Sequence, residues 1–177
     1  MAYTTALTAV ANASLTAAQW NASVRDNLAE TAPAKATTAG SFFVATAANT
    51  IAERIPKAHT VGTTQNTTLT SYTNLATVGP TVTVTSGANA LIMWGAQLYS
   101  GTTGQSIYMS YAISGATSVA ATDASAVVST NTLNYPIQMS RVVLQSTTAG
   151  SNVITCQYRV DGGTGNYGQR NLNVVPF

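Results

Sequence analysis

Charged side chains are scarce in this sequence. Only seven of the 177 residues are Lys or Arg and five are Asp or Glu, whereas roughly a quarter of the residues of a soluble domain are charged. The segment 61–177 is the poorest, and its five charged residues are Asp123, Arg141, Arg159, Asp161 and Arg170. Because the basic residues are scattered singly and form no stripe, the sequence does not predict a surface that binds the phosphates of a nucleic acid.

Residue types that carry catalytic and metal chemistry are also scarce. The one cysteine, Cys156, excludes an intrachain disulfide and a thiolate metal knuckle, and its alternation with apolar neighbours predicts a small buried side chain. The one histidine, His59, lies in a Pro-flanked segment that we expect to be a solvated linker, and no G-x-S-x-G motif accompanies it. A glycosidase needs two carboxylates across a cleft, and residues 61–177 offer only Asp123 and Asp161. We therefore predict that the protein is not an enzyme and holds no cofactor or metal ion.

Long apolar runs are missing as well. The segment Ala90–Ala96 is far shorter than the roughly 20 apolar residues of a membrane-spanning helix. The first ten residues lack the basic region and the long apolar core of a secretory signal. We expect a soluble protein that is made in a cytoplasm and does not cross a membrane by itself.

The composition of the chain changes near residue 60. Residues 1–60 contain 18 alanines and seven of the twelve charged residues. Residues 61–177 are rich in Thr, Ser, Asn and Gly and show alternating apolar positions. We therefore predict two regions, an N-terminal arm of a helix and a hairpin over residues 1–60 and a β domain over residues 61–177.

A helix is predicted within the arm. Thr16 and Gln19 have the spacing of a capping box, in which each side chain satisfies a backbone N–H of the other residue. Trp20, Val24 and Leu28 follow at spacings of four and form a narrow apolar stripe on a helix of about a dozen residues. Such a short helix is marginal alone in water, and burial of the stripe would contribute roughly 5–8 kcal/mol. The stripe therefore needs a partner, which is the chain's own domain, symmetry copies or another protein.

A short hairpin is predicted between the helix and the β domain. The sequence favours strands at 41–45 and 50–55, joined by a turn at Ala48-Asn49 and closed by Pro56. An isolated two-stranded hairpin is marginally stable at best, so we expect this segment to be a bridge rather than a domain.

Alternating apolar residues predict many short strands beyond residue 61. The clearest segments are 81–85, 107–113 and 154–160, which are separated by turn signals. The pattern favours a mainly antiparallel β-sandwich or jelly roll. The segment 91–99 differs because both of its faces are apolar, and such a strand lies either in the middle of a sandwich or at a subunit contact. We predict a contact between copies of the chain that involves Leu91, Ile92, Met93, Trp94 and Leu98.

The aromatic residues leave two interpretations open. Tyr99, Tyr108 and Tyr167 lie near predicted turns or on the polar face of a strand, where they could stack on a sugar ring. Tyrosine is equally expected where subunits of an oligomer meet. We favour the oligomer contact, and a carbohydrate is the other candidate partner.

Three segments resemble proteins of bacteriophage particles. The run Leu15–Leu28, which ends in Arg25-Asp-Asn-Leu28, resembles the opening helix of minor tail and fibre proteins, especially those of phages that infect actinobacteria. The segment 40–56 is similar to the short hairpin modules of fibre stems. The segment 158–176 resembles the closing strands of the β domain that ends such proteins, with the layout of a trimeric C1q/TNF-like jelly roll. Fibres of this family are often much longer, with a docking domain or a collagen-like shaft.

The resemblance implies a structural protein of a bacteriophage virion. It implies a homotrimer of C-terminal jelly rolls, displayed as a tail-associated fibre or spike that contacts other virion proteins and can contact the host. Trp20, Val24 and Leu28 would then anchor the arm to the particle. A capsid decoration or head-fibre protein is the alternative within the virion, and a stand-alone carbohydrate-binding module is the alternative of a different class.

Overall fold

The computed structural model describes residues 14–130 and 134–177. The chain divides into two compact units, Met1–Ile55 and Pro56–Phe177. A boundary after residue 60 would cut strand β3 (Lys57–Val61), which pairs along its length with the last strand of the second unit. His59 lies within β3, and its ring Nδ1 accepts a hydrogen bond from the Thr81 N–H at 2.9 Å. The linker assignment of His59 is therefore wrong, because long-range strand pairing holds it in a sheet.

The first unit contains the predicted helix. Its consecutive segments are α1 (Ala17–Trp20), the π-helical η1 (Asn21–Arg25) and α2 (Asp26–Ala29). The Thr16 hydroxyl accepts a hydrogen bond from the Gln19 N–H at 3.2 Å, and the Gln19 side chain accepts one from the Thr16 N–H at 2.9 Å. The predicted capping box is thus confirmed. A further short helix, α3 (Ala32–Lys35), follows.

The first unit also contains the predicted hairpin. Strands β1 (Phe42–Ala47) and β2 (Thr50–Arg54) pair antiparallel. Asn49 makes the turn with a φ of 56°, a left-handed conformation that Asn tolerates better than most residues. The predicted positions of the strands and of the turn are confirmed.

Glu53 of β2 connects the hairpin to the loop that precedes it. Its carboxylate accepts hydrogen bonds from the backbone N–H groups of Thr37 at 3.0 Å and Thr38 at 2.8 Å. The hydroxyls of Ser41 and Thr37 donate to the same carboxylate. These bonds, that of Ser41 above all, lower the pKa of Glu53 to about 2.

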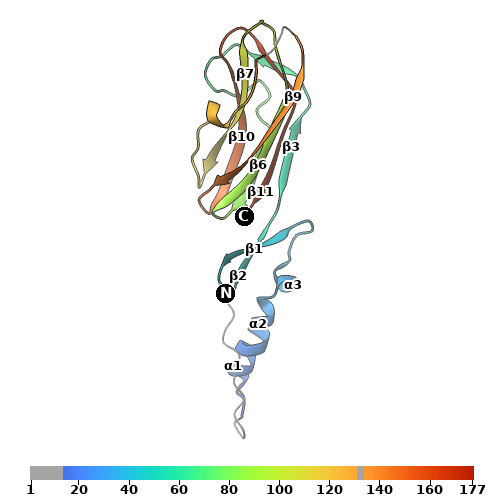
Figure 1. Ribbon diagram of the computed structural model, residues 1–177. Coiled ribbons are helices and arrows are strands. Elements are labelled where there is room, and N and C mark those ends of the chain that lie inside the picture. The colour runs from blue at the N-terminus through green and yellow to red at the C-terminus, as the bar shows by residue number, and fades with distance from the viewer. Residues whose placement is uncertain (1–13, 131–133) are drawn as a thin grey trace. The chain divides into compact units, whose positions relative to one another are not determined.

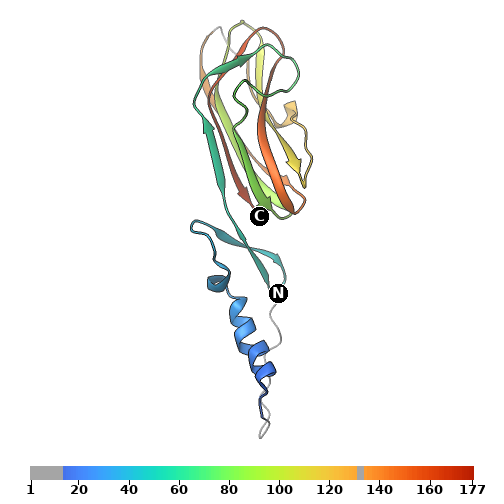
Figure 2. The same cartoon turned by 180° about the vertical axis from the view of Figure 1, so that it is seen from behind.

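The second unit consists of two antiparallel sheets. One has the strand order β5-β10-β7-β8, and the other has the order β3-β11-β6-β9 with β4 also paired to β11. The remaining strands are β4 (Gln65–Thr67), β5 (Thr81–Ser86), β6 (Asn89–Ser100), β7 (Ser106–Gly115), β8 (Val127–Thr130), β9 (Ile137–Ser146), β10 (Gly150–Val160) and β11 (Gly165–Pro176), and a 3-10 turn, η2 (Asp123–Ser125), precedes β8. Figures 1 and 2 show the two sheets lying face to face. Most connections pass from one sheet to the other, as in a jelly roll, so the predicted fold class is confirmed.

The core lies between the two sheets because alternate side chains of each strand point inward. Ile92, Trp94 and Leu98 of β6 are fully buried there. The Trp94 ring packs edge-to-face against Tyr111 of β7, with ring centroids 4.7 Å apart. Its indole N–H donates to the Met109 carbonyl at 3.3 Å. One chain therefore covers these large side chains by itself.

Among residues 14–130 and 134–177, no helix combines the length and the apolarity that crossing a bilayer requires.

Candidate functional site

An apolar patch lies on the outer side of the five-stranded sheet. In the register of β6 and β9, Leu91 lies opposite Leu144 and Met93 lies opposite Val142. On the other side of β6, Val175 of β11 lies opposite Leu91. Leu144 is 60% exposed and Val142 is 58% exposed, while the other three side chains are half-buried by their neighbours. These five residues are called the outer apolar patch.

A hollow of about 360 Å³ adjoins the outer apolar patch. It is lined by Met93, Trp94, Ser140, Arg141, Val142, Asn171 and Asn173. Gly95 allows β9 to approach β6 here, because a Cβ at this position would lie 2.5 Å from the Met139 carbonyl oxygen. The lining includes Met93 and Arg141, and methionine and arginine are both enriched where proteins bind one another.

The predicted contact residues of β6 divide between the two faces of the strand. Ile92, Trp94 and Leu98 are fully buried in the core of their own chain. The prediction that they contact another copy is wrong, because the opposite sheet of the same chain already covers them. Leu91 and Met93 lie in the outer apolar patch, so for these two a contact between copies stays a prediction.

Strand β9 was not among the strands predicted from the sequence, although it supplies the two most exposed residues of the patch. Val142 and Leu144 flank Val143, which points inward and packs against the core. This short run is apolar on both faces of the strand, like the segment 91–99 with which it pairs. The presence of two such segments in one β domain was the sequence pattern that could have predicted an apolar surface formed by both strands.

Trp20, Val24 and Leu28 lie on the helix of the first unit. Trp20 is 55% exposed and Leu28 is 60% exposed, while Val24 is half-buried. Leu15, just before the helix cap, is a further exposed apolar residue. Large apolar side chains repeated at helical spacing are typical of a helix that binds a groove of another protein. An anchoring role in a virion stays a prediction.

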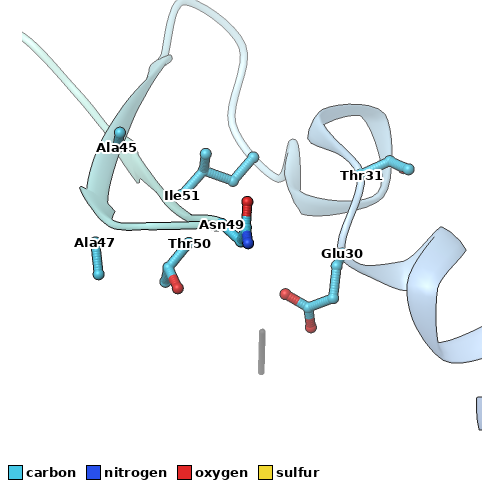
Figure 3. Close-up of a pocket in the computed structure, with 7 residues that line it drawn as sticks. All are labelled: Glu30, Thr31, Ala45, Ala47, Asn49, Thr50 and Ile51. Carbon is cyan, nitrogen blue, oxygen red and sulfur yellow. The ribbon is translucent and has the colours of Figure 1, made fainter. Parts of the chain in front are cut away.

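A cleft of about 290 Å³ lies within the first unit, between the end of the helix and the hairpin. Figure 3 shows Glu30 and Thr31 on one side and hairpin residues, among them Asn49 and Ile51, on the other. The Glu30 carboxylate lies 2.7 Å from the Lys35 ammonium, and this contact lowers the pKa of Glu30. The seven described residues that line the cleft include no His or Cys and a single, already paired carboxylate, so they offer no nucleophile beside a base.

Arg159 organises a polar cluster on the outer side of the four-stranded sheet. Its Nε donates to the Asp123 carboxylate at 2.8 Å, and its guanidinium lies 3.8 Å from the centroid of the Tyr108 ring. The Tyr72 hydroxyl donates to the same carboxylate at 2.9 Å. The Arg159 contact lowers the pKa of Asp123, and burial raises the pKa of Tyr72. The cluster therefore fastens two connecting segments to β10.

The three tyrosines considered for sugar binding do not form one surface. Tyr167 is fully buried, and Tyr108 lies against the Arg159 guanidinium. Tyr99 lies on β6, in the sheet opposite to that of Tyr108. The three tyrosines therefore offer no common stacking surface, and a glycan as a partner stays a prediction. A role of tyrosines in contacts between copies stays a prediction.

The other candidate catalytic residues have structural partners. The Asp161 carboxylate accepts a hydrogen bond from the Ser106 N–H at 2.6 Å, and Asp123 is bound to Arg159. Cys156 is fully buried, as predicted, and burial raises the pKa of its thiol. Within residues 14–130 and 134–177, no group of three or more His, Cys, Asp or Glu side chains could hold a metal ion.

Arg170 of β11 is a fully buried cation. Its guanidinium donates to the carbonyl oxygens of Thr63 at 3.3 Å, Thr77 at 3.3 Å and Gly79 at 3.2 Å. It also donates to the Gln65 side chain at 3.0 Å. Since these acceptors lie between β3 and β5, Arg170 holds that connection against the last strand.

No protein-family model and no curated protein sequence matches this chain. Among solved structures, the chain is similar to the Eiger TNF of S. frugiperda, with a TM-score of 0.47 and 10% identity over 70% of this chain and 92% of that chain. It is also similar to VP2 of infectious bursal disease virus in a subviral particle, with a TM-score of 0.46 and 14% identity over 75% of this chain. The aligned region spans only 36% of the VP2 chain.

A third likeness is to the carbohydrate-binding module CBM6cm-2 of Cellvibrio mixtus lichenase 5A, solved in complex with cellotriose. Its TM-score is 0.34, with 11% identity over 81% of this chain and 92% of that chain. Likenesses at such low identity concern the fold alone, since one fold hosts many unrelated functions.

Proposed function

We propose that the protein is a structural component of a virus particle and assembles as a homotrimer through the outer apolar patch. The observation that carries the proposal is the exposure of Val142 and Leu144 beside Leu91 and Met93 on a sheet whose inner side is already filled. Contiguous apolar patches on a protein surface mark sites of interaction. Three copies, rather than two, follow from the resemblance to trimeric C1q/TNF-like jelly rolls.

The charge distribution supports contact between identical surfaces. The residues of β6, β9 and β11 that point outward are all described by the structure, and none of them is charged. The one described cation beside the patch, Arg141, lines the adjoining hollow and donates a hydrogen bond to the Ala126 carbonyl at 3.1 Å. Apart from Arg141, two copies of the same surface meet without repulsion between like charges. A neutral outer face is also consistent with the scarcity of charge in residues 61–177.

The first unit supports attachment to a particle. Its exposed Trp20 and Leu28 form a second apolar surface, which belongs to a compact unit separate from the jelly roll. Two apolar surfaces on two units suit two different partners, copies of the chain for the jelly roll and a virion protein for the helix. The resemblance of residues 15–28 to minor tail and fibre proteins supports a bacteriophage tail as the proposed docking site, with the protein as a fibre or spike.

Purified phage particles labelled with an antibody against residues 56–177 test this proposal. Label on the tail supports the fibre or spike, whereas label on the capsid selects a decoration or head-fibre protein. Absence of the protein from washed particles contradicts both. The proposed role is binding rather than catalysis, and sustained release of sugar from host polysaccharide by the purified protein would contradict that part.

A further inference from the structure

We infer that the outer side of the four-stranded sheet carries a binding site for one unit of a neutral sugar. The site is a groove of about 200 Å³ lined by Asn74, Ala112, Ile113, Ser114, Thr155 and Gln157. It lies on the sheet opposite to that of the outer apolar patch, so self-association through that patch leaves it accessible. The inference deepens the proposed function and rests on it for the source of the sugar, because a protein displayed on a particle meets the glycans of a host cell.

The polar side chains of the groove are available to a ligand. Asn74 and Gln157 carry amides, and Ser114 carries a hydroxyl. Within residues 14–130 and 134–177, none of these three side chains makes a hydrogen bond. The Thr155 hydroxyl accepts a bond from Thr81 at 3.2 Å and retains its own donor. Free amide and hydroxyl groups thus surround one concave surface.

Ser110 provides a second, independent observation. It lies directly opposite Gln157 in the register of β7 and β10, on the outer face that also carries Ala112 and Ser114. Its side chain is fully buried, yet in the described part of the chain its hydroxyl has no hydrogen-bond partner. Buried polar groups without a partner are rare in folded proteins. When a ligand orders the Gln157 amide, the amide oxygen can accept a hydrogen bond from the Ser110 hydroxyl. The amide N–H groups can then donate to the ligand at the same time.

The chemistry of the groove selects a neutral ligand with several hydroxyl groups. None of its six described lining residues is charged, so a phosphate or a carboxylate would find no counter-charge. The nearest cation along β10, Arg159, is already bound to Asp123. Sugar hydroxyls both donate and accept, and they match a mixture of amides and hydroxyls. The groove is smaller than the roughly 300–1,000 Å³ pockets of drug-sized ligands, which fits one sugar unit of a longer chain.

Nuclear magnetic resonance of the isotope-labelled full chain tests the site directly. The probes are glucose, galactose, mannose, rhamnose and N-acetylglucosamine, with N-acetylneuraminic acid as the charged comparison. We expect at least one neutral sugar to shift the backbone amide signals of Ala112, Ser114 and Thr155. The inference is overturned if no neutral sugar shifts these signals, or if only the charged sugar does.

Substitutions in the groove sharpen the test. Asn74→Ala and Gln157→Ala should each raise the Kd about two- to tenfold, as expected for the loss of one hydrogen bond. Ala112→Phe should abolish binding by filling the groove. The matched control is Asn66→Ala, because Asn66 is also exposed but lies on β4 of the other sheet. Since Asn74 is exposed, its substitution leaves the fold intact, and an unchanged Kd in Asn74→Ala and Gln157→Ala would overturn the assignment.

The two proposals fail separately. A protein that binds a neutral sugar in the groove but is absent from particles refutes the proposed function and leaves the groove assignment in place. A protein found on particles that binds none of the neutral sugars overturns the groove assignment alone.

Discussion

Substituting the two most exposed residues of the outer apolar patch should separate the copies without unfolding them. The double variant carries Val142→Thr and Leu144→Thr. Threonine favours the strand conformation because it is β-branched, and both native side chains are more than half exposed in the single chain. For substitutions at such surface positions, we expect the free energy of unfolding of one chain to change by less than about 0.5 kcal/mol each.

The effect on association follows from the exposed fractions. Complete burial of a Val or Leu side chain contributes about 1.5–3 kcal/mol. Because Leu144 is 60% exposed and Val142 is 58% exposed, covering what remains contributes about 1–2 kcal/mol for each residue. Threonine retains part of the apolar surface, so the expected loss is about 2–3 kcal/mol for the pair, which is about a 30- to 150-fold weaker contact.

Sedimentation velocity over a series of protein concentrations measures this change. Val78→Thr is the matched control, because Val78 is 54% exposed and lies in the connection before β5, outside the patch. The control should associate like the unmodified protein, while the double variant should dissociate at higher concentration. Equal association of the double variant and the unmodified protein, or equal weakening by the control, would refute the role of the patch.

Three further predictions concern other parts of the chain. Arg170→Ala removes a buried cation and leaves its acceptors unpaired, so the free energy of unfolding measured in urea should fall by about 3–5 kcal/mol; a loss below about 1 kcal/mol would contradict this. Because the pKa of Glu53 is lowered from 4.5 to about 2, its contacts with the preceding loop should be complete above pH 4.5 and lost as the pH falls towards 2. The amide signal of Thr38 reports this loss, Glu53→Gln should remove the pH dependence, and a transition above pH 5 would speak against it. Trp20→Ala should leave residues 56–177 folded by circular dichroism but lower incorporation into particles, and unchanged incorporation would count against the anchor.

Local features of the first unit could be predicted from the sequence. The capping box of Thr16 and Gln19 satisfies backbone groups within one helical turn. The hairpin turn at Asn49 depends on the backbone freedom of one residue. In the second unit, strict alternation located β5, β7 and β10 and indicated a sandwich. Such signals extend over a few residues and need no knowledge of partners.

Long-range pairing could not be predicted from the same patterns. His59 lies in a strand because β3 pairs with β11, more than a hundred residues later. The two apolar faces of the segment 91–99 differ in burial, because β6 lies between β9 and β11. One face is buried against the opposite sheet, and the other lies on the outer side of its own sheet. Alternation shows that both faces are apolar but does not show which one is covered by the chain itself. Only the structure shows that Trp94 is buried in the core of its own chain while Met93 lies in the outer apolar patch.

The mass of the unmodified protein in solution tests self-association most directly. Sedimentation equilibrium of the full chain, from high concentration downward, should yield three times the 18.2 kDa of one chain. A mass of 18.2 kDa at every concentration would contradict the account, because the outer apolar patch would then remain in water.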